Sequence, residues 1–290
     1  MPDFQKQTVQ WFPGHMARTR RKIKESLPLV DAVVEIVDAR IPESSRNPEL
    51  DEITSGKPRI ILLNKSDIAD QSATDAWMNH FRNRGAYVLA VDCKSGKGLN
   101  NFVPTVRKAL AERIAQNEAK GMAGRPLRLM VVGIPNTGKS SFINRMSQKN
   151  KLQVANRPGV TRSNQWVVCG DGIELLDTPG VLWPKFEDPA VGDKLAFIGS
   201  VKDDIMDVET IAVRLLEILK TDYTDRLVER YKVDPSVAGL EAWEVLEEIG
   251  RKRGMLLRGG EVDTERAAGT LLTEYRGGRL GKITLERPKG

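Results

Sequence analysis

The chain has 290 residues, of which 40% are hydrophobic and 29% charged, proportions that are ordinary for a globular protein and exclude a collagenous or wholly disordered chain. Its two cysteines lack metal-ligand spacing and are too few for a disulfide framework, so we expect Cys93 and Cys169 to be small buried side chains. No apolar run approaches the ~20 residues that span a bilayer, and residues 1–16 lack the apolar core of a secretory signal. The sequence therefore predicts a cytoplasmic protein with no membrane contact.

The net charge of +6 is concentrated at the two ends of the chain. Residues 1–27 contain six lysines and arginines against two acids, and residues 251–290 contain ten against five. Basic ends of this kind are typical of contact with RNA phosphates, and solvated surface helices are the alternative. Aromatic residues are not interleaved with the basic ones, so we expect recognition of RNA shape rather than of base sequence. The basic residues are Arg18, Arg20, Arg21, Lys22 and Lys24 near the start, and Arg251, Lys252, Arg253 and Arg258 near the end.

Six short runs rich in valine, isoleucine and leucine predict the strands of a sheet. Four of them alternate with stretches of helical pattern, which is typical of a parallel sheet covered by helices on both faces. We therefore expect a doubly wound α/β domain over residues 1–185, with a polar connector at 117–126. The predicted strands are 32–40, 59–65, 86–93, 127–133, 165–170 and 173–180.

Strand patterns stop near residue 185, and amphipathic helix patterns follow them. The apolar positions predict three helices that pack together in a second domain over residues 186–290. Gly277 and Gly278 are expected to end the last helix, before a basic tail. The apolar positions are Val208, Ile211, Leu215 and Leu219, then Leu240, Trp243, Leu246 and Ile249, then Ala267, Leu271 and Tyr275.

The first motif, Asn64-Lys65-Ser66-Asp67, lies at the end of the predicted strand 59–65. An aspartate here can accept hydrogen bonds from both N1–H and the exocyclic amine of guanine, a pair of donors that adenine lacks. Because a buried carboxylate left half-paired is costly, Asp67 predicts selectivity for guanine. We expect Asn64 to bridge to the base or to the phosphate loop, and the Lys65 stem to cover the face of the ring.

A second, shorter motif follows the strand 86–93 and reads Cys93-Lys94-Ser95-Gly96. Its position after a strand predicts that Cys93, Lys94 and Ser95 line the base and that one backbone amide meets the guanine O6. The motif is short and weak by itself, because an ordinary turn at the end of a strand is common.

The third motif runs from Gly133 to Ser140 and fits the pattern G-x-x-x-x-G-K-[ST], between a predicted strand and a predicted helix. Glycines let the backbone wrap around phosphates, and amides at the start of the helix supply partial positive charge. Lys139 adds a full charge at the β- and γ-phosphates, and the Ser140 hydroxyl is a ligand for Mg²⁺. The residues expected to bind the nucleotide here are Gly133, Asn136, Thr137, Gly138, Lys139, Ser140 and Ser141.

The fourth motif, Asp177-Thr178-Pro179-Gly180, ends the last predicted strand. Asp177 can hold Mg²⁺ through a water molecule, and the Gly180 amide can approach the γ-phosphate. Alone the motif is also an ordinary turn, but it lies at the carboxyl end of a strand, the edge at which such sheets bind ligands. Together the four motifs predict a protein that binds GTP and GDP.

The order of these motifs is permuted. In an ordinary Ras-type GTPase the phosphate loop comes first and the guanine motif late, whereas here both guanine motifs precede the phosphate loop. The chain resembles the circularly permuted GTPases, and specifically the YlqF-type ribosome biogenesis GTPase A family. The resemblance extends to WFPGHM (11–16), DARIP (38–42) and PGVT (158–161), and it covers almost the entire chain.

The resemblance implies roles for three further residues. It makes His15 the residue that orients the attacking water, because Ras-like enzymes use a glutamine where this chain has Val181. The alternative is that the segment around His15 only packs on the sheet. It makes Thr161 the switch threonine that reaches Mg²⁺ and the γ-phosphate, so that His15, Lys139 and Thr161 would carry catalysis. It makes Asn136 a ligand for K⁺, which would place positive charge near the β/γ bridge.

The resemblance also implies a fold and a function. The fold is a circularly permuted Ras-like P-loop domain followed by a small helical domain that binds RNA or the ribosome. The function is GTP hydrolysis in assembly of the large (50S) ribosomal subunit, stimulated by the subunit precursor and its rRNA, by a protein that we expect to be a monomer. The alternatives are a GTP-gated RNA-binding scaffold with negligible turnover and a permuted GTPase that acts on the small subunit. Asp38 and Arg40 belong to the family pattern, but the sequence assigns them no role.

Overall fold

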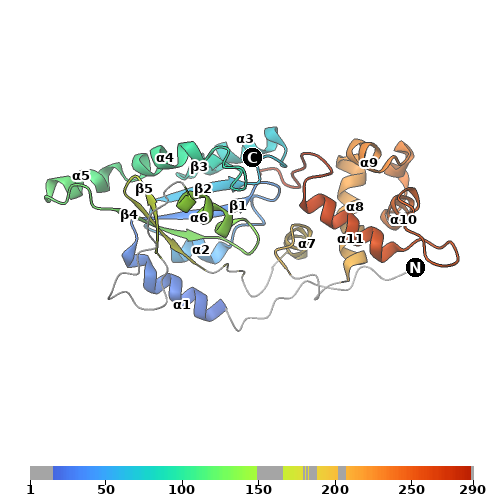
Figure 1. The fold of residues 1–290 in the computed structure, drawn as a ribbon, viewed down its shortest axis with the longest axis horizontal. Helices are drawn as coiled ribbons and strands as arrows, with labels where there is room; N and C mark the ends of the chain where they lie inside the picture. Colours follow the sequence, from blue (N-terminus) through green and yellow to red (C-terminus); the bar gives the residue numbers. More distant parts are fainter. Residues whose placement is uncertain are drawn as a thin grey trace. The chain divides into compact units, whose positions relative to one another are not determined.

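Two units make up the structure, a computed structural model that describes residues 16–148, 166–178, 180, 182, 188–201 and 207–288. The first unit runs to Pro184 and includes the chain from Glu286 onward, and the second ends at Leu285. In Figure 1 the sheet lies in the first unit, and the described part of the second is built from helices and their connections.

The first unit is built on a six-stranded sheet in the order β3-β2-β1-β4-β6-β5. All neighbouring pairs are parallel except β5 and β6, which form an antiparallel edge. The structure thus confirms the predicted α/β fold with a mostly parallel sheet of six strands. The strands are β1 Ala32–Asp38, β2 Arg59–Asn64, β3 Tyr87–Ala90, β4 Leu127–Val132, β5 Trp166–Gly170 and β6 Ile173–Asp177.

The central strand β1 shows why these apolar runs become strands. All of its residues are buried, and its side chains alternate between the two faces of the sheet. Ala32, Val34 and Ile36 pack with α4 and α6, whereas Val33 packs with α1 and α2. Helices therefore cover both faces (Figure 1). The helices of this unit are α1 Met16–Ser26, α2 Pro48–Ile53, α3 Gln71–Asn83, α4 Phe102–Ala109, α5 Ala111–Ala119 and α6 Lys139–Gln148.

The second unit is organised around α8, which packs against α10 and α11. These three helices confirm the three predicted helix patterns, but α7 and α9 are additional. Leu240 precedes α10 and Trp243 is only half-buried, because the buried face of α10 runs through Ala242, Val245 and Ile249. No helix in the described ranges is long and apolar enough to cross a membrane. The helices are α7 Pro189–Phe197, α8 Val208–Asp222, α9 Thr224–Tyr231, α10 Ala242–Lys252 and α11 Thr264–Arg276.

The last residues of the chain correct the predicted domain limits. The sequence pattern assigns residues 286–290 to the helical domain, whereas Glu286 belongs to the first unit. The Glu286 carboxylate accepts the amides of Glu43 at 2.8 Å and Ser44 at 3.1 Å, and its carbonyl oxygen accepts the indole N–H of Trp77 at 3.1 Å. These contacts join residues up to 243 positions apart in the sequence, a separation at which local patterns carry no information.

Candidate functional site

The nucleotide motifs lie at one edge of the sheet, at the carboxyl ends of its strands. Asn64 ends β2, the loop 133–138 follows β4, and Asp177 ends β6. β1 lies between β2 and β4, and its last residue, Asp38, pairs in register with Asn64. In the strand order, β2 and β3 lie on one side of β1, whereas β6 and β5 lie on the other side of β4, so the order reverses between the neighbours β1 and β4. This edge is therefore the switch point at which doubly wound sheets bind ligands.

The phosphate loop between β4 and α6 takes its shape from unusual backbone angles and internal hydrogen bonds. Gly133 has φ of 146°, and a Cβ there would lie 2.6 Å from the Ile36 carbonyl oxygen, so only glycine fits. Asn136 has φ of 62°, a left-handed conformation that non-glycine residues adopt mostly at functional sites. Lys139 Nζ donates to the Ile134 carbonyl oxygen at 2.6 Å, so the ammonium lies over the loop. An anion at the start of α6 would meet this charge and the helix amides.

Asn64 joins the base side of the site to the phosphate loop. Its Nδ2 donates to the Thr137 carbonyl oxygen at 2.6 Å, and its Oδ1 accepts the Cys93 amide at 2.9 Å. The residue is 3% exposed, so these bonds form away from competing water. This is the bridge that the sequence predicted, and it ties three loops into one frame.

Gly138 leaves room for this bridge, and replacing it with alanine should loosen the frame. Gly138 has φ of 104°, and a Cβ there would lie 2.2 Å from Asn64 Nδ2. We expect Gly138→Ala to weaken GDP binding about tenfold, because breaking a buried hydrogen bond costs ~1–3 kcal/mol. Titration with a fluorescent GDP analogue measures the effect. The control is Gly172→Ala, which is strained in the same way but meets nothing within 4 Å; equal affinities of the two variants would contradict the prediction.

Lys65 and Asp67, which are expected to contact the base, lie in the loop after β2. Lys65 has φ of 62°, and its Nζ donates to the Asn136 carbonyl oxygen at 3.0 Å. Its aliphatic stem therefore stretches from this loop after β2, here called the base loop, to the phosphate loop. The Ser66 amide and hydroxyl both donate to the Val91 carbonyl oxygen, at 3.2 and 3.0 Å, which fixes the course of the loop. Asp67 is exposed, so its carboxylate is accessible to a ligand.

Three amides of the loop 93–96, which is expected to place one amide at guanine O6, form hydrogen bonds to Asp92. The amides of Lys94 and Ser95 donate to the Asp92 carboxylate at 2.8 and 3.2 Å, and that of Gly96 donates to the Asp92 carbonyl oxygen at 2.7 Å. A guanine oxygen must therefore share these donors with Asp92 or replace it. These residues alone do not indicate this arrangement, because several turn geometries fit them.

Lys139 and Asp177 are the charged pair on the phosphate side. Lys139 is 8% exposed, and burial lowers its pKa to about 8, although the charge of Asp177 acts in the opposite direction. Burial raises the pKa of Asp177, against the opposing charges of Lys139 and Lys22. A Cβ on Gly180 would lie 2.8 Å from Lys139 Nζ and 2.9 Å from the Pro135 nitrogen, so the chain after β6 closely approaches the phosphate loop. A γ-phosphate bound there would meet both segments.

Ser140 and Asp177 are the described side chains that could hold Mg²⁺. Ser140 and its neighbour Ser141 are exposed in the first turn of α6, and Asp177 is half-buried at the end of β6. Because Mg²⁺ usually takes only one or two protein oxygens besides phosphate and water, a hydroxyl and a carboxylate suit it. Asn136 is exposed at the tip of the phosphate loop, where a K⁺ ligand would be needed.

Two predicted site residues, His15 and Thr161, lie outside the described residues. Leu182, two positions after Gly180, is 2% exposed, so this aliphatic side chain is buried and offers no hydrogen bond to a water molecule. Arg145 on α6 was not predicted from the sequence; it donates to the Lys94 carbonyl oxygen at 2.7 Å and supports the loop 93–96. An arginine on a surface helix carries no local signal of such a contact.

Comparisons with known proteins agree with this geometry. Residues 128–235 match a family model described as a 50S ribosome-binding GTPase. The chain is 46% identical over 281 residues to ribosome biogenesis GTPase A of Bacillus licheniformis, which covers 97% of this chain and 99% of that protein. A GDP-bound YlqF structure has a TM-score of 0.66 and 30% identity, covering 93% of this chain and all 100% of that one. A GNP-bound YlqF structure from T. maritima has a TM-score of 0.66 and 31% identity, covering 94% of this chain and 99% of that one.

The extent of these matches fits the permuted motif order. The family model begins in β4, immediately before the phosphate loop, because both guanine motifs precede that strand in this chain. The full-length relatives, in contrast, cover both halves of the site. The chain therefore belongs to the ribosome biogenesis GTPase A family and is a GTPase that binds GTP and GDP.

Proposed function

We propose that this GTPase acts in assembly of the large (50S) ribosomal subunit. In its GTP-bound form it binds the subunit precursor and its rRNA, and it is released after GTP hydrolysis. The observation that carries the proposal is the connection after β6. That strand ends at Asp177, beside Lys139, and α7 of the helical unit begins at Pro189, twelve positions later. The helical unit thus follows in the chain directly after the segment proposed to meet the γ-phosphate, and segments of this kind order or release with the nucleotide state. The description of the family model and the names of the relatives support the ribosome as partner.

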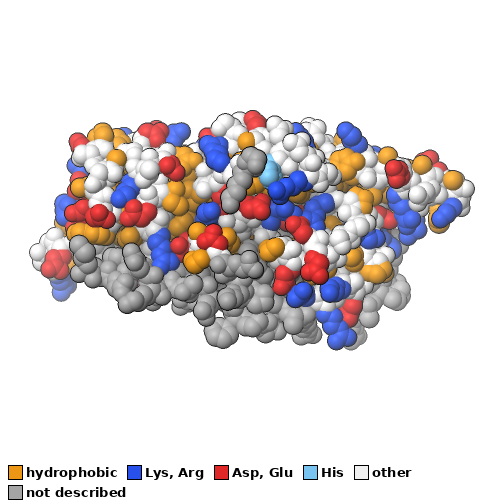
Figure 2. Space-filling model, turned by 180° about the vertical axis from the view of Figure 1, so that it is seen from behind, with side chains coloured by type: hydrophobic (Ala, Val, Ile, Leu, Met, Phe, Trp, Pro, Cys, Tyr) orange, Lys and Arg blue, Asp and Glu red, His pale blue; other side chains and the backbone are white. Residues whose placement is uncertain are grey.

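The charges of the helical unit support RNA as the part of the ribosome that it meets. Arg251 lies 3.4 Å from Glu247 and 3.1 Å from Glu248, and its side chain is 58% exposed. Figure 2 shows lysines and arginines interspersed with acidic side chains on the face that it draws. Exposed pairs of this kind contribute only ~0–1 kcal/mol, so RNA phosphates can replace the carboxylates at little cost. The absence of a base-stacking platform among the basic residues 251–253 and 258 favours recognition of folded RNA by shape.

Magnesium and potassium belong to the same proposal. Mg²⁺ would be held by Ser140, Asp177 and Thr161, and when bound it would neutralise charge on the β- and γ-phosphates. K⁺ would be held by Asn136, and the bound ion would supply a positive charge without an arginine. Turnover measured in potassium chloride and in sodium chloride at equal ionic strength tests the second ion, because only K⁺ should accelerate hydrolysis.

His15 is proposed as the residue that orients the attacking water. We expect His15→Ala to lower ribosome-stimulated turnover by at least about tenfold, in keeping with the loss of a positioned proton acceptor, and to leave GTP affinity intact. The control is His80→Ala, because His80 packs edge-on against Trp77 in α3, at 5.2 Å between ring centroids. Single-turnover phosphate release measures the rate. Unchanged turnover in His15→Ala would remove the residue from the mechanism.

Phosphate release and co-sedimentation with separated ribosomal subunits test the function as a whole. We expect large subunits to stimulate GTP hydrolysis, small subunits not to, and the protein to sediment as a complex with large-subunit precursors in the presence of a non-hydrolysable GTP analogue. Binding without stimulated hydrolysis would instead favour a GTP-gated scaffold. Stimulation by small subunits alone would move the proposed target to the small subunit. Light scattering of the free protein tests the proposed monomer.

A further inference from the structure

A buried ion cluster lies at the end of β1, and the roles above use neither its Asp38 nor its Arg40. The side chains of Asp38 and Arg40 are 0% and 1% exposed. Arg40 donates to Asp38 Oδ1 through Nε at 2.9 Å and to Oδ2 through Nη2 at 2.9 Å, and its amide also donates to Oδ1 at 3.1 Å. A further contact comes from the guanine motif, because Lys65 Nζ lies 2.9 Å from Asp38 Oδ2.

The Asp38 carboxylate is both charged and fixed in direction. Burial alone would raise its pKa, but the charges and hydrogen bonds of Arg40 and Lys65 outweigh burial and hold the pKa well below its usual range. The two parallel bonds from the guanidinium also set the plane of the carboxylate, since such paired contacts are geometrically specific. Asp38 therefore offers Lys65 a rigid anionic anchor at physiological pH.

Lys65 is held at both ends of its side chain. Its backbone adopts the left-handed conformation at the end of β2, and its ammonium lies between the Asp38 carboxylate and the Asn136 carbonyl oxygen. Only the aliphatic stem remains between these points, and the side chain is 24% exposed. A free lysine samples many rotamers and loses that freedom when a ring packs on it. Here most of that freedom is lost before any ligand binds, which favours binding.

We propose that Asp38, oriented by Arg40, is a positioning residue that fixes the Lys65 stem as a preformed surface for the guanine ring. The inference rests on the proposed role of Lys65 in covering the base. Asp38 is buried and acts through Lys65, so its loss should weaken nucleotide binding without slowing the chemical step. The expected effect is about a tenfold rise in the Kd for GDP, which corresponds to ~1.4 kcal/mol.

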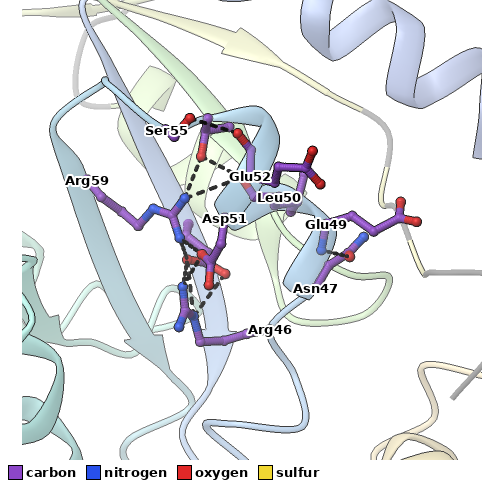
Figure 3. Close-up of polar contacts among 10 residues, drawn as sticks. Arg46, Asn47, Glu49, Leu50, Asp51, Glu52, Ser55 and Arg59 are labelled. Atoms are coloured by element: carbon purple, nitrogen blue, oxygen red, sulfur yellow. Dashed lines mark hydrogen bonds and ion pairs between the residues drawn. The ribbon is translucent and has the colours of Figure 1, made fainter. Parts of the chain in front are cut away.

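Glu35 provides the matched control, because it is another buried carboxylate on the same strand. It is 1% exposed and forms ion pairs with Arg46 at 3.1 Å and Arg59 at 3.3 Å. Figure 3 shows these two arginines converging on Asp51 of α2. None of these four residues belongs to a nucleotide motif, so loss of the Glu35 charge reports on the general cost of breaking a buried network in β1.

A double-mutant cycle on GDP binding tests the inference, with Lys65→Met, Asp38→Asn and the two combined. Each single variant should raise the Kd about tenfold, and the combined variant should bind no more weakly than Lys65→Met alone. The KM for GTP should rise in Asp38→Asn while kcat stays unchanged. Glu35→Gln should bind GDP as the unmodified protein does.

Three outcomes separate the possibilities. Additive losses in the combined variant, or an unchanged Kd in Asp38→Asn, would overturn the positioning role. An unchanged Kd in Lys65→Met would instead refute the proposed role of Lys65 itself. If Asp38→Asn does not unfold cooperatively, Arg40→Lys takes its place in the cycle, because it keeps both charges and loses the paired geometry. Arg40→Lys should then weaken GDP binding only when Lys65 is present. If Arg40→Lys caused the same loss of GDP affinity in a protein that also carries Lys65→Met, the proposal would be overturned.

Discussion

Replacing Asp67 with asparagine should lower the affinity for GTP about a thousandfold, because two charge-assisted hydrogen bonds to the base are lost. Asp67 is exposed at the end of a loop whose course is fixed by Ser66 and Lys65, so the substitution changes the recognising group and little else. Xanthine carries a carbonyl where guanine carries the exocyclic amine. An asparagine can donate to that carbonyl and still accept from N1–H, so the variant should prefer xanthosine triphosphate.

Competition titrations with GTP, ATP and xanthosine triphosphate measure this change of preference. The control is Asp70→Asn, three positions later, because Asp70 caps α3 by accepting the Ala73 amide at 2.7 Å. Asparagine caps helices as well as aspartate does, so this variant should keep the affinity for GTP. Equal binding of ATP and GTP by the unmodified protein would refute the assignment of Asp67 before any variant is made.

The sheet and the positions of the motifs are predictable from the sequence because both depend on local patterns. Apart from Glu35 and Asp38, the run at 32–38 is apolar on both faces, as is typical of a strand between two helical layers. The phosphate loop and Asp177 each follow such a run, so their place at the carboxyl edge follows from the parallel order of the strands. The glycine pair at 277–278 likewise predicts the end of α11 by its backbone freedom.

The parts that escape prediction depend on pairing between distant segments. Asp38 meets Lys65 only because β1 and β2 pair with Asp38 beside Asn64, and a shift of two residues would separate them. Glu286 reaches the loop after β1 from the far end of the chain. The helix α7 has only nine residues, and its buried positions are Gly192 and the run 195–197; because glycine adds no apolar side chain, the sequence shows no apolar stripe of helical period there.

Replacing Lys139 with alanine should lower nucleotide affinity at least about a hundredfold, because several charge-assisted hydrogen bonds to phosphate are lost. Lys139 is 8% exposed and its ammonium lies over the phosphate loop, so water cannot substitute for it effectively. Titration with GDP measures the loss, and the unfolding temperature without nucleotide checks the fold. Lys120→Ala, which removes an exposed charge at the end of α5, should bind GDP normally. A similar affinity in both variants would contradict a phosphate contact by Lys139.

The pH dependence of binding tests the same ammonium without changing the protein. Because burial lowers the pKa of Lys139 to about 8 and bound phosphates favour the charged form, binding above that pH requires uptake of a proton. The affinity for GDP should therefore fall about tenfold between pH 7 and pH 9. The stability of the free protein changes in the opposite direction. Between pH 8 and the ordinary lysine value of 10.5, the unfolded chain keeps the proton that the folded protein has lost. Raising the pH through this range therefore removes the cost of burying a charged lysine and increases the free energy of unfolding.

Lys139→Arg supplies the comparison for this pH profile, because arginine stays charged throughout the range and any titration of the base itself affects both proteins equally. The variant should bind more weakly at pH 7 and lose little further affinity by pH 9. Calorimetry in two buffers of different ionisation enthalpy should detect proton uptake at pH 8.5 in the unmodified protein and little in the variant. Parallel profiles would mean that Lys139 keeps its charge in the free protein, and the effect of its burial would then have to be offset by Asp177.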